Sequence, residues 1–203
     1  MKVTDREYAL ELDKNDPLAH FKSQFVITDP EMCYLDGNSL GRLPKATITS
    51  INDFMNKEWG PEVVTGWSHW VDEAQPTGDL LGEAALGAAP GQVLVCDTTS
   101  VNFYQLCLAA IHARPGRKTI ITDAANFPTD RYILDGIAKQ FGLNLVIIDN
   151  EDPAIAENEL ITAELLEKYM SEDVALVTFE VIQYRSGART DIQSVTDLAR
   201  SYG

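Results

Sequence analysis

The stretch Gln92-Val93-Leu94-Val95-Cys96-Asp97-Thr98-Thr99-Ser100-Val101-Asn102 joins an apolar run to a segment with helical periodicity. Residues 92–96 are short, rich in β-branched side chains and preceded by a Pro-Gly pair, which predicts a buried strand. After the turn, apolar residues recur at helical spacing until the next Pro-Gly pair at 115–116 (Val101, Tyr104, Leu108 and Ile111). The turn therefore leads the chain from a strand into the N-terminus of a helix.

A helix N-terminus flanked by hydroxyl side chains suits a phosphate group. The first N–H groups of a helix lack partners within it and carry partial positive charge. The hydroxyls of Thr98, Thr99 and Ser100 lie beside them in the sequence. The alternative is that Thr98 or Thr99 only caps the helix. No glycine-rich loop is present, so the turn taken alone favours a simple cap.

The chain beyond this turn continues to alternate strands and helices. Strands are predicted at 118–122, 143–148 and 174–179, and helices at about 130–140, 162–170 and 191–201. This order predicts an α/β fold with three layers, in which a mostly parallel sheet has helices on both faces. Ligands of such sheets bind beyond the carboxyl ends of the strands. Residues 96–102, 123–130 and 180–187 fall on that edge.

Residues 1–60 differ from this pattern and are predicted to be an N-terminal arm with helices that packs on the large domain. Residues 61–203 are then the first part of that domain. In the arm, two short helices are expected around Asp16-Pro17 and a longer one at 44–59, and another helix follows at 77–89. Three tryptophans lie close together near a loop (Trp59, Trp67 and Trp70), where aromatic side chains either fill a core or line a ligand pocket.

Composition and charge exclude several classes of protein. The 203 residues are 45% hydrophobic and 23% charged, as in globular domains. The net charge of −15 argues against a nucleic-acid partner. No apolar run has membrane-spanning length and no signal peptide is recognisable, which predicts no membrane association. Three widely spaced cysteines favour reduced thiols and hence a cytoplasmic protein.

Several common catalytic motifs do not occur in the sequence. There is no Walker A motif, no Gly-x-Gly-x-x-Gly after a strand and no Gly-x-Ser-x-Gly elbow. The three histidines stand apart from carboxylates and cysteines at ligand spacing, so no metal site is expected.

Five segments taken together resemble kynureninase in order and spacing (residues 34–41, 59–67, 97–102, 126–132 and 184–187). The resemblance implies the large domain of a pyridoxal 5'-phosphate (PLP)-dependent enzyme of fold type I, the aspartate aminotransferase type, in incomplete form. Kynureninases are homodimeric hydrolases that cleave L-kynurenine, or its analogue 3-hydroxykynurenine, acting on a C–C bond to release anthranilate and L-alanine from L-kynurenine. They serve tryptophan catabolism, the kynurenine pathway and NAD biosynthesis.

The resemblance also implies roles for residues that match the family motifs. Thr99 and Ser100 match the positions that hold the cofactor phosphate, Phe127 the aromatic that stacks on the pyridine ring, and Asp130 an acidic residue beside the cofactor. The positions of substrate contacts are matched by Ser39 and Trp67, the latter against the aminophenyl ring.

Two departures from the family pattern are expected to matter. Glu180 stands where bacterial relatives usually carry a small hydroxyl residue, and a carboxylate near a phosphate is repelled unless it is protonated or turned away. The Schiff-base lysine of the family lies downstream of the helix that begins near Asp191, and none of the eight lysines here matches it. We therefore expect no catalytic residue in this chain and no activity from it alone.

Two other interpretations remain open at this point. The chain could be a non-catalytic binding or dimerisation module derived from a PLP-enzyme fold. It could also be an α/β domain that binds another phosphate-bearing ligand. The kynureninase interpretation is favoured by the presence of Ser39, Trp67, Phe127 and Asp130, because a pure interaction module has no need of a cofactor-stacking aromatic.

Overall fold

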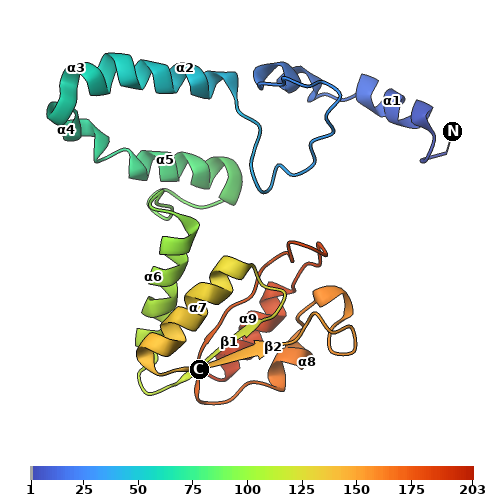
Figure 1. Cartoon of the computed structure of the whole chain (residues 1–203), viewed down its shortest axis with the longest axis vertical. Helices are drawn as coiled ribbons and strands as arrows, with labels where there is room; N and C mark the ends of the chain where they lie inside the picture. The colour runs from blue at the N-terminus through green and yellow to red at the C-terminus, as the bar shows by residue number, and fades with distance from the viewer. Residues whose placement is uncertain (1) are drawn as a thin grey trace. The chain divides into compact units, whose positions relative to one another are not determined.

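The computed structural model describes residues 2–203, and the chain divides into two compact units (Figure 1). The first ends at Leu94, and the second runs from Val95 to Gly203. The predicted arm of residues 1–60 falls within the first unit, and its packing on the large domain stays a prediction. No helix in residues 2–203 has both the length and the apolar composition needed to cross a membrane.

The first unit is built of helices and loops. Its helices include 3₁₀ turns and two π-helical segments, and they follow in this order: α1 (Arg6–Lys14), η1 (Ala19–Gln24), α2 (Lys45–Asp53), η2 (Phe54–Trp59), α3 (Gly60–Glu62), η3 (Val63–Gly66), α4 (Trp67–Trp70), α5 (Ala74–Leu81) and η4 (Gly82–Leu86). The two short helices around Asp16-Pro17 and the helix ending at Trp59 are confirmed.

Within the first unit the buried residues are glycines. Gly78 of α5 lies so close to the following chain that a Cβ built on it would be 2.1 Å from the carbonyl oxygen of Val93. The Gln75 side chain donates to that same carbonyl at 3.0 Å. These contacts hold residues 92–94 against α5.

The predicted strand at 92–96 is wrong. These residues are irregular, and Leu94 and Val95 expose 59% and 43% of their surface. A strand needs a neighbour that accepts its ladder of hydrogen bonds. In the described chain the Val93 carbonyl is bonded to Gln75 instead, so no ladder forms.

The second unit is the predicted α/β domain. It contains α6 (Thr99–His112), β1 (Thr119–Asp123), α7 (Pro128–Phe141), β2 (Asn144–Ile148), η5 (Glu157–Glu159), α8 (Ala163–Glu167), β3 (Val174–Val177) and α9 (Ile192–Ser201). The strand order is β2-β1-β3, and both pairs are parallel. Thr119 of β1 pairs with Asn144 of β2, and Ile121 with Val177 of β3.

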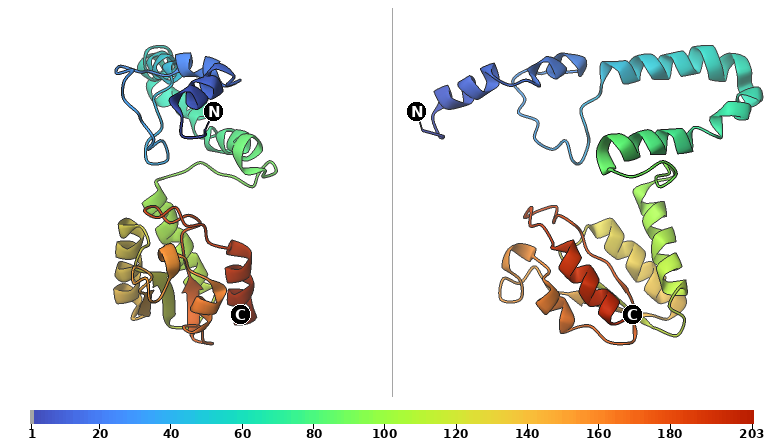
Figure 2. Two further views of the ribbon diagram at one scale, coloured as in Figure 1. Left: turned by 90° about the vertical axis from the view of Figure 1, so that its right-hand side faces the viewer. Right: turned by 180° about the vertical axis from the view of Figure 1, so that it is seen from behind.

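Helices cover both faces of this sheet, as expected for parallel strands (Figure 2, left). On one face α6 and α7 pack on the sheet through Cys107, Ile111, Ile120, Leu134 and Ile137. On the other face α8 and α9 pack through a cluster that includes Ile121, Leu166 and Val195. The buried hydrophobic residues of the described chain all belong to this unit, which identifies it as the part with a core of its own.

Candidate functional site

The N-terminus of α6 presents unpaired hydrogen-bond donors. Thr98 is the N-cap, because its Oγ1 accepts the Val101 N–H at 3.3 Å, while the Asn102 N–H donates to the Thr98 carbonyl at 2.9 Å. Within residues 2–203, neither the N–H groups nor the hydroxyls of Thr99 and Ser100 take part in a hydrogen bond. The cap is thus a different residue from the two expected to hold a phosphate.

The turn before α6 is fixed by its own side chains. Asn102 Nδ2 reaches back to the Cys96 carbonyl at 2.9 Å, which closes the turn over six residues. Asp97 within it has φ +47°, a left-handed conformation that non-glycine residues adopt at a cost of about 1–2 kcal/mol. The turn before α6 is therefore stabilised by a contact within residues 96–102.

A buried carboxylate links the loops that follow the three strands. Asp123, at the end of β1, is fully buried. Its oxygens accept amide N–H groups from Asn126 at 3.1 Å, from Asn150 at 2.8 Å and from Gln183 at 2.9 Å. Burial raises the pKa of Asp123, and the three amide donors oppose that rise because they favour the charged form. The network ties the loop after each strand to a single carboxyl group.

Phe127 and Glu180 are held together at this edge of the sheet. The Phe127 N–H donates to Glu180 Oε1 at 3.0 Å, and the Phe127 ring meets the Tyr184 ring edge to face at 5.3 Å. The Phe127 side chain is 46% exposed, which leaves part of its ring available for stacking. Glu180 therefore fixes the backbone of the aromatic residue rather than standing free beside it.

Burial also raises the pKa of Glu180. Backbone N–H groups of Phe127 and Tyr184 oppose this rise, and the nearby Asp123 and Asp130 add to it by charge repulsion. Asp130, in the first turn of α7, has its pKa raised by burial as well. The edge thus holds three carboxyl groups that take up protons more readily than in water.

The structure brings some of the predicted site residues together and leaves others apart. Phe127, Asp130 and Glu180 share one edge of the second unit. In the described residues, no hydrogen bond joins Thr99 or Ser100 to Phe127 or Asp130. No group of three or more His, Cys, Asp or Glu side chains in residues 2–203 is placed to hold a metal ion.

In the first unit, Ser39 lies in the turn of residues 36–40. Its hydroxyl donates to Asp36 Oδ1 at 2.7 Å, and its N–H donates to the Asp36 carbonyl at 3.2 Å. Tyr34 closes the same turn through a hydrogen bond from its hydroxyl to the Leu40 carbonyl. Asp36 therefore orients the Ser39 side chain.

Trp67 lines an apolar hollow of about 440 Å³, which is formed by Phe54, Trp59, Trp67, Trp70 and Val71. Trp67 is 64% exposed, whereas Trp70 packs over Gly66, so that a Cβ on Gly66 would meet the indole at 2.2 Å. The Trp70 indole N–H donates to Glu58 at 3.3 Å. Trp70 thus fills space within the unit, whereas Trp67 leaves most of its surface exposed.

Sequence reasoning missed the carboxyl network around Asp123 and the hydrogen bond between Glu180 and Phe127. A usable signal existed for the first, because Asp123 and Asn150 each come at or just after the end of an apolar run. No signal marked the second, since 53 residues separate the partners.

Comparison with solved structures places the fold in a class. A C-DES mutant with glycine covalently linked to the PLP cofactor superposes with a TM-score of 0.68 at 16% identity, covering 92% of this chain and 46% of that one. DndA from Streptomyces lividans gives 0.59 at 18% identity, covering 78% and 43%. At these identities the likeness shows the fold alone. The fold is that of the PLP-dependent enzymes of fold type I, here as an incomplete α/β domain.

The sequence relatives are kynureninases. The chain is 33% identical to kynureninase of Pseudomonas fluorescens over 209 aligned residues, which cover 99% of this chain and 47% of the relative. With kynureninase of Burkholderia pseudomallei it shares 34% over 205 aligned residues, and with that of Deinococcus radiodurans 33% over 198. The chain spans about half the length of these relatives. No family model matches it. The resemblance inferred from the five segments is confirmed.

Proposed function

We propose that this chain supplies the cofactor-phosphate and ring-holding part of a kynureninase-like hydrolase, which cleaves L-kynurenine or 3-hydroxykynurenine at a C–C bond. The observation that carries the proposal is the set of open donors on Thr99 and Ser100, in a chain 33% identical to a kynureninase over nearly its whole length. A cytoplasmic homodimer that works in tryptophan catabolism and NAD biosynthesis is part of the same proposal.

The residues present fit PLP as the cofactor. Two N–H groups and two hydroxyls at the start of a 14-residue helix suit a phosphate dianion, and the half-exposed Phe127 ring suits an aromatic heterocycle. Bound PLP would supply an electron sink for the carbon skeleton of the substrate. Glu180 holds the Phe127 backbone through its N–H, and the Phe127 ring packs edge to face on Tyr184. One oxygen of the Glu180 carboxyl group, Oε1, is directed toward that N–H.

On the substrate side, we assign the contacts to Ser39 and Trp67. The Trp67 ring offers an apolar face next to Phe54 and Trp59, which suits an aminophenyl group. The Ser39 hydroxyl is oriented by Asp36, so its oxygen lone pairs stay open to a donor on the substrate.

The test separates capping from phosphate binding with variants at adjacent positions. The double variant Thr99→Ala/Ser100→Ala removes two hydroxyl donors, each worth roughly 1.5–3 kcal/mol toward a charged group. The affinity of the chain for PLP, measured by calorimetric titration, should then fall by at least about tenfold. Its thermal stability should change little, because neither hydroxyl caps α6.

Thr98→Ala is the matched control. It removes the cap, so the free energy of unfolding should fall by about 1 kcal/mol, with a much smaller change in PLP affinity. Unchanged PLP affinity in the double variant would refute the assignment of Thr99 and Ser100, and binding of inorganic phosphate equal to that of PLP would favour a domain for another phosphate ligand.

A further inference from the structure

Residues 184–187, one of the five family-like segments, form the tip of a short hairpin that follows β3. The hairpin is closed by backbone hydrogen bonds: the Gln183 N–H donates to the Ala188 carbonyl, and the Gly187 N–H to the Gln183 carbonyl, both at 2.9 Å. The Gln183 side chain is buried and donates to Asp123 at 2.9 Å. The base of the hairpin is thus tied to the core of the second unit.

The Phe127 ring needs more than its backbone to hold one orientation. Glu180 accepts the Phe127 N–H at 3.0 Å, but the direction of the ring still depends on rotation about χ1 and χ2. The side chain is 46% exposed, so solvent leaves room for other rotamers. A side chain that must settle into one rotamer when a ligand binds loses conformational entropy. A neighbour that selects the orientation beforehand therefore raises the affinity for the ligand.

Tyr184, at the tip of the hairpin, is such a neighbour. Its ring centroid lies 5.3 Å from that of Phe127, and the two ring planes meet at 76°, which is the favourable edge-to-face geometry. The Tyr184 N–H also lies near the Glu180 carboxyl group that holds the Phe127 N–H. One carboxyl group therefore brings the backbones of both aromatic residues together.

Arg185 ties the tip of the hairpin to the loop that follows β2. Its Nη2 pairs with Oε1 of Glu151 and with Oε1 of Glu159, the latter at 3.1 Å. Its guanidinium carbon lies 5.6 Å from the centroid of the Tyr184 ring, within the roughly 6 Å range of a cation–π contact. The same guanidinium thus contacts the aromatic ring and two carboxylates.

The carboxylate side of this ion cluster is itself held by the core. Asn158 and Glu159 have φ +52° and +64°, left-handed conformations that persist only where the surrounding structure fixes them. The buried Asn150 side chain donates to the Glu159 carbonyl at 2.7 Å and to Asp123 at 2.8 Å. Isolated surface ion pairs contribute little, whereas charges held in a network contribute more. The cluster therefore suits an anchor for the hairpin tip.

We propose that Tyr184 is a positioning residue for the Phe127 ring, and that Arg185 holds Tyr184 in place through Glu151 and Glu159. The consequence for PLP rests on the proposed function, in which Phe127 is the residue that stacks on the cofactor ring. The contact between the two aromatic rings exists without a ligand, so the positioning is measurable in the cofactor-free chain.

The first measurement is the nuclear Overhauser effect between the Phe127 and Tyr184 rings in the cofactor-free 203-residue chain. We expect this effect in the wild type. We expect its loss, together with a shift of the Phe127 ring resonances, in Arg185→Gln, because that variant removes the charge shared by the two carboxylates.

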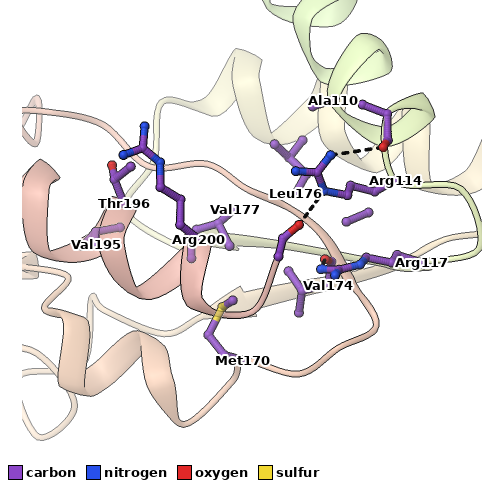
Figure 3. Close-up of a pocket in the computed structure, with 14 residues that line it drawn as sticks. Ala110, Arg114, Arg117, Met170, Val174, Leu176, Val177, Val195, Thr196 and Arg200 are labelled. Carbon is purple, nitrogen blue, oxygen red and sulfur yellow. Dashed lines mark hydrogen bonds between the residues drawn. The ribbon is translucent and has the colours of Figure 1, made fainter.

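Two other arginines supply matched controls, because the same substitution makes the same change in net charge. Arg189 lies in the same hairpin and is exposed, and in residues 2–203 its side chain takes part in no hydrogen bond or ion pair. Arg200 lies outside the hairpin, at a hollow of about 430 Å³ beside β3 and α9, where Figure 3 shows it extending beside Thr196. Arg189→Gln and Arg200→Gln should both keep the contact between the rings.

The second measurement is the affinity of the chain for PLP, obtained by calorimetric titration. Tyr184→Leu and Arg185→Gln should each weaken it by at least about threefold, as loss of an aromatic pair does. Tyr184→Phe keeps the ring and should retain the affinity of the wild type, as should Arg189→Gln. A residue needed only for the stability of the hairpin would lower the melting temperature and leave the affinity of the folded chain unchanged.

Phe127→Leu separates this proposal from the proposed function. If it leaves the PLP affinity unchanged, the stacking role of Phe127 in the proposed function is refuted, and the cofactor-free measurement alone decides the positioning. Three outcomes overturn the positioning: contact between the rings that survives Arg185→Gln, loss of affinity in Phe127→Leu but not in Tyr184→Leu, or an effect of Arg189→Gln equal to that of Arg185→Gln.

Discussion

At the edge of the sheet, Glu180 both holds a backbone N–H group and belongs to a cluster of carboxyl groups. Glu180 accepts the Phe127 N–H, and it lies near two further carboxyl groups, Asp123 and Asp130. Its burial and its acidic neighbours both favour the protonated form. The backbone position of Phe127 is thus coupled to the ionisation of a carboxyl group.

This coupling gives the stability of the chain a defined dependence on pH. The folded-state pKa of Glu180 lies above its unfolded value of about 4.3. Protonated Glu180 therefore contributes its full stabilisation below about pH 4.3, and this contribution is lost as the pH rises through the folded-state pKa. Gln at this position keeps an acceptor for the Phe127 N–H without a charge. We predict that the melting temperature of Glu180→Gln minus that of the wild type increases from pH 4 to pH 7. A difference that stays constant or decreases would contradict the coupling.

At the level of elements, two helical glycines are expected to change stability in opposite directions when they are replaced by alanine. Gly136 in α7 has open space around it, whereas a Cβ on Gly78 in α5 would be 2.1 Å from the Val93 carbonyl oxygen. Replacing Gly by Ala in a helix normally gains roughly 0.5–1 kcal/mol. Gly136→Ala should therefore stabilise the chain, and Gly78→Ala should destabilise it by about 1–3 kcal/mol, as overpacking does.

Chemical denaturation of the two glycine variants beside the wild type measures both effects. The observation that would count against the packing of residues 92–94 on α5 is a stabilising Gly78→Ala. A destabilising Gly136→Ala would instead mean that the exposed side of α7 is covered.

The elements were predictable to different degrees, for physical reasons. The runs around Ile121, Ile147 and Leu176 were found because each is apolar, short and bounded by turn residues. The run around Leu94 has the same composition, yet it forms no strand, because pairing depends on a neighbour that local sequence does not specify. The α6 cap could be predicted from the sequence because Thr98 and its partner Val101 are three residues apart. The hydrogen bond between Phe127 and Glu180 joins residues 53 positions apart and therefore required the tertiary structure.

At the scale of the whole molecule, the lysines bear on whether the chain can anchor PLP covalently. All eight are exposed, with three in the second unit (Lys118, Lys139 and Lys168). A cofactor-anchoring lysine normally owes its reactivity to desolvation or to a charged neighbour. None of these exposed lysines is desolvated, and the charged neighbours of Lys57 and Lys139 are aspartates rather than cations, so none should dominate.

We predict that PLP followed by borohydride labels several lysines of this chain, each at low occupancy, as judged by peptide mass spectrometry. The chain unfolded in urea serves as the control and should give a similar distribution. Stoichiometric labelling of one lysine in the folded chain only would show that this prediction is wrong and would assign a catalytic residue.

Because Cys107 is buried between α6 and the sheet, the rate at which its thiol is alkylated reports how often α6 separates from the sheet. Burial, and to a lesser extent the charge of Asp130, raise the pKa of its thiol to about 11, while Cys33 and Cys96 are exposed. An alkylating reagent at neutral pH therefore reacts with the two exposed sulfurs first and with Cys107 only when α6 leaves the sheet. The rate of the slow third alkylation then gives the frequency with which α6, the helix that begins with Thr99 and Ser100, opens from the sheet.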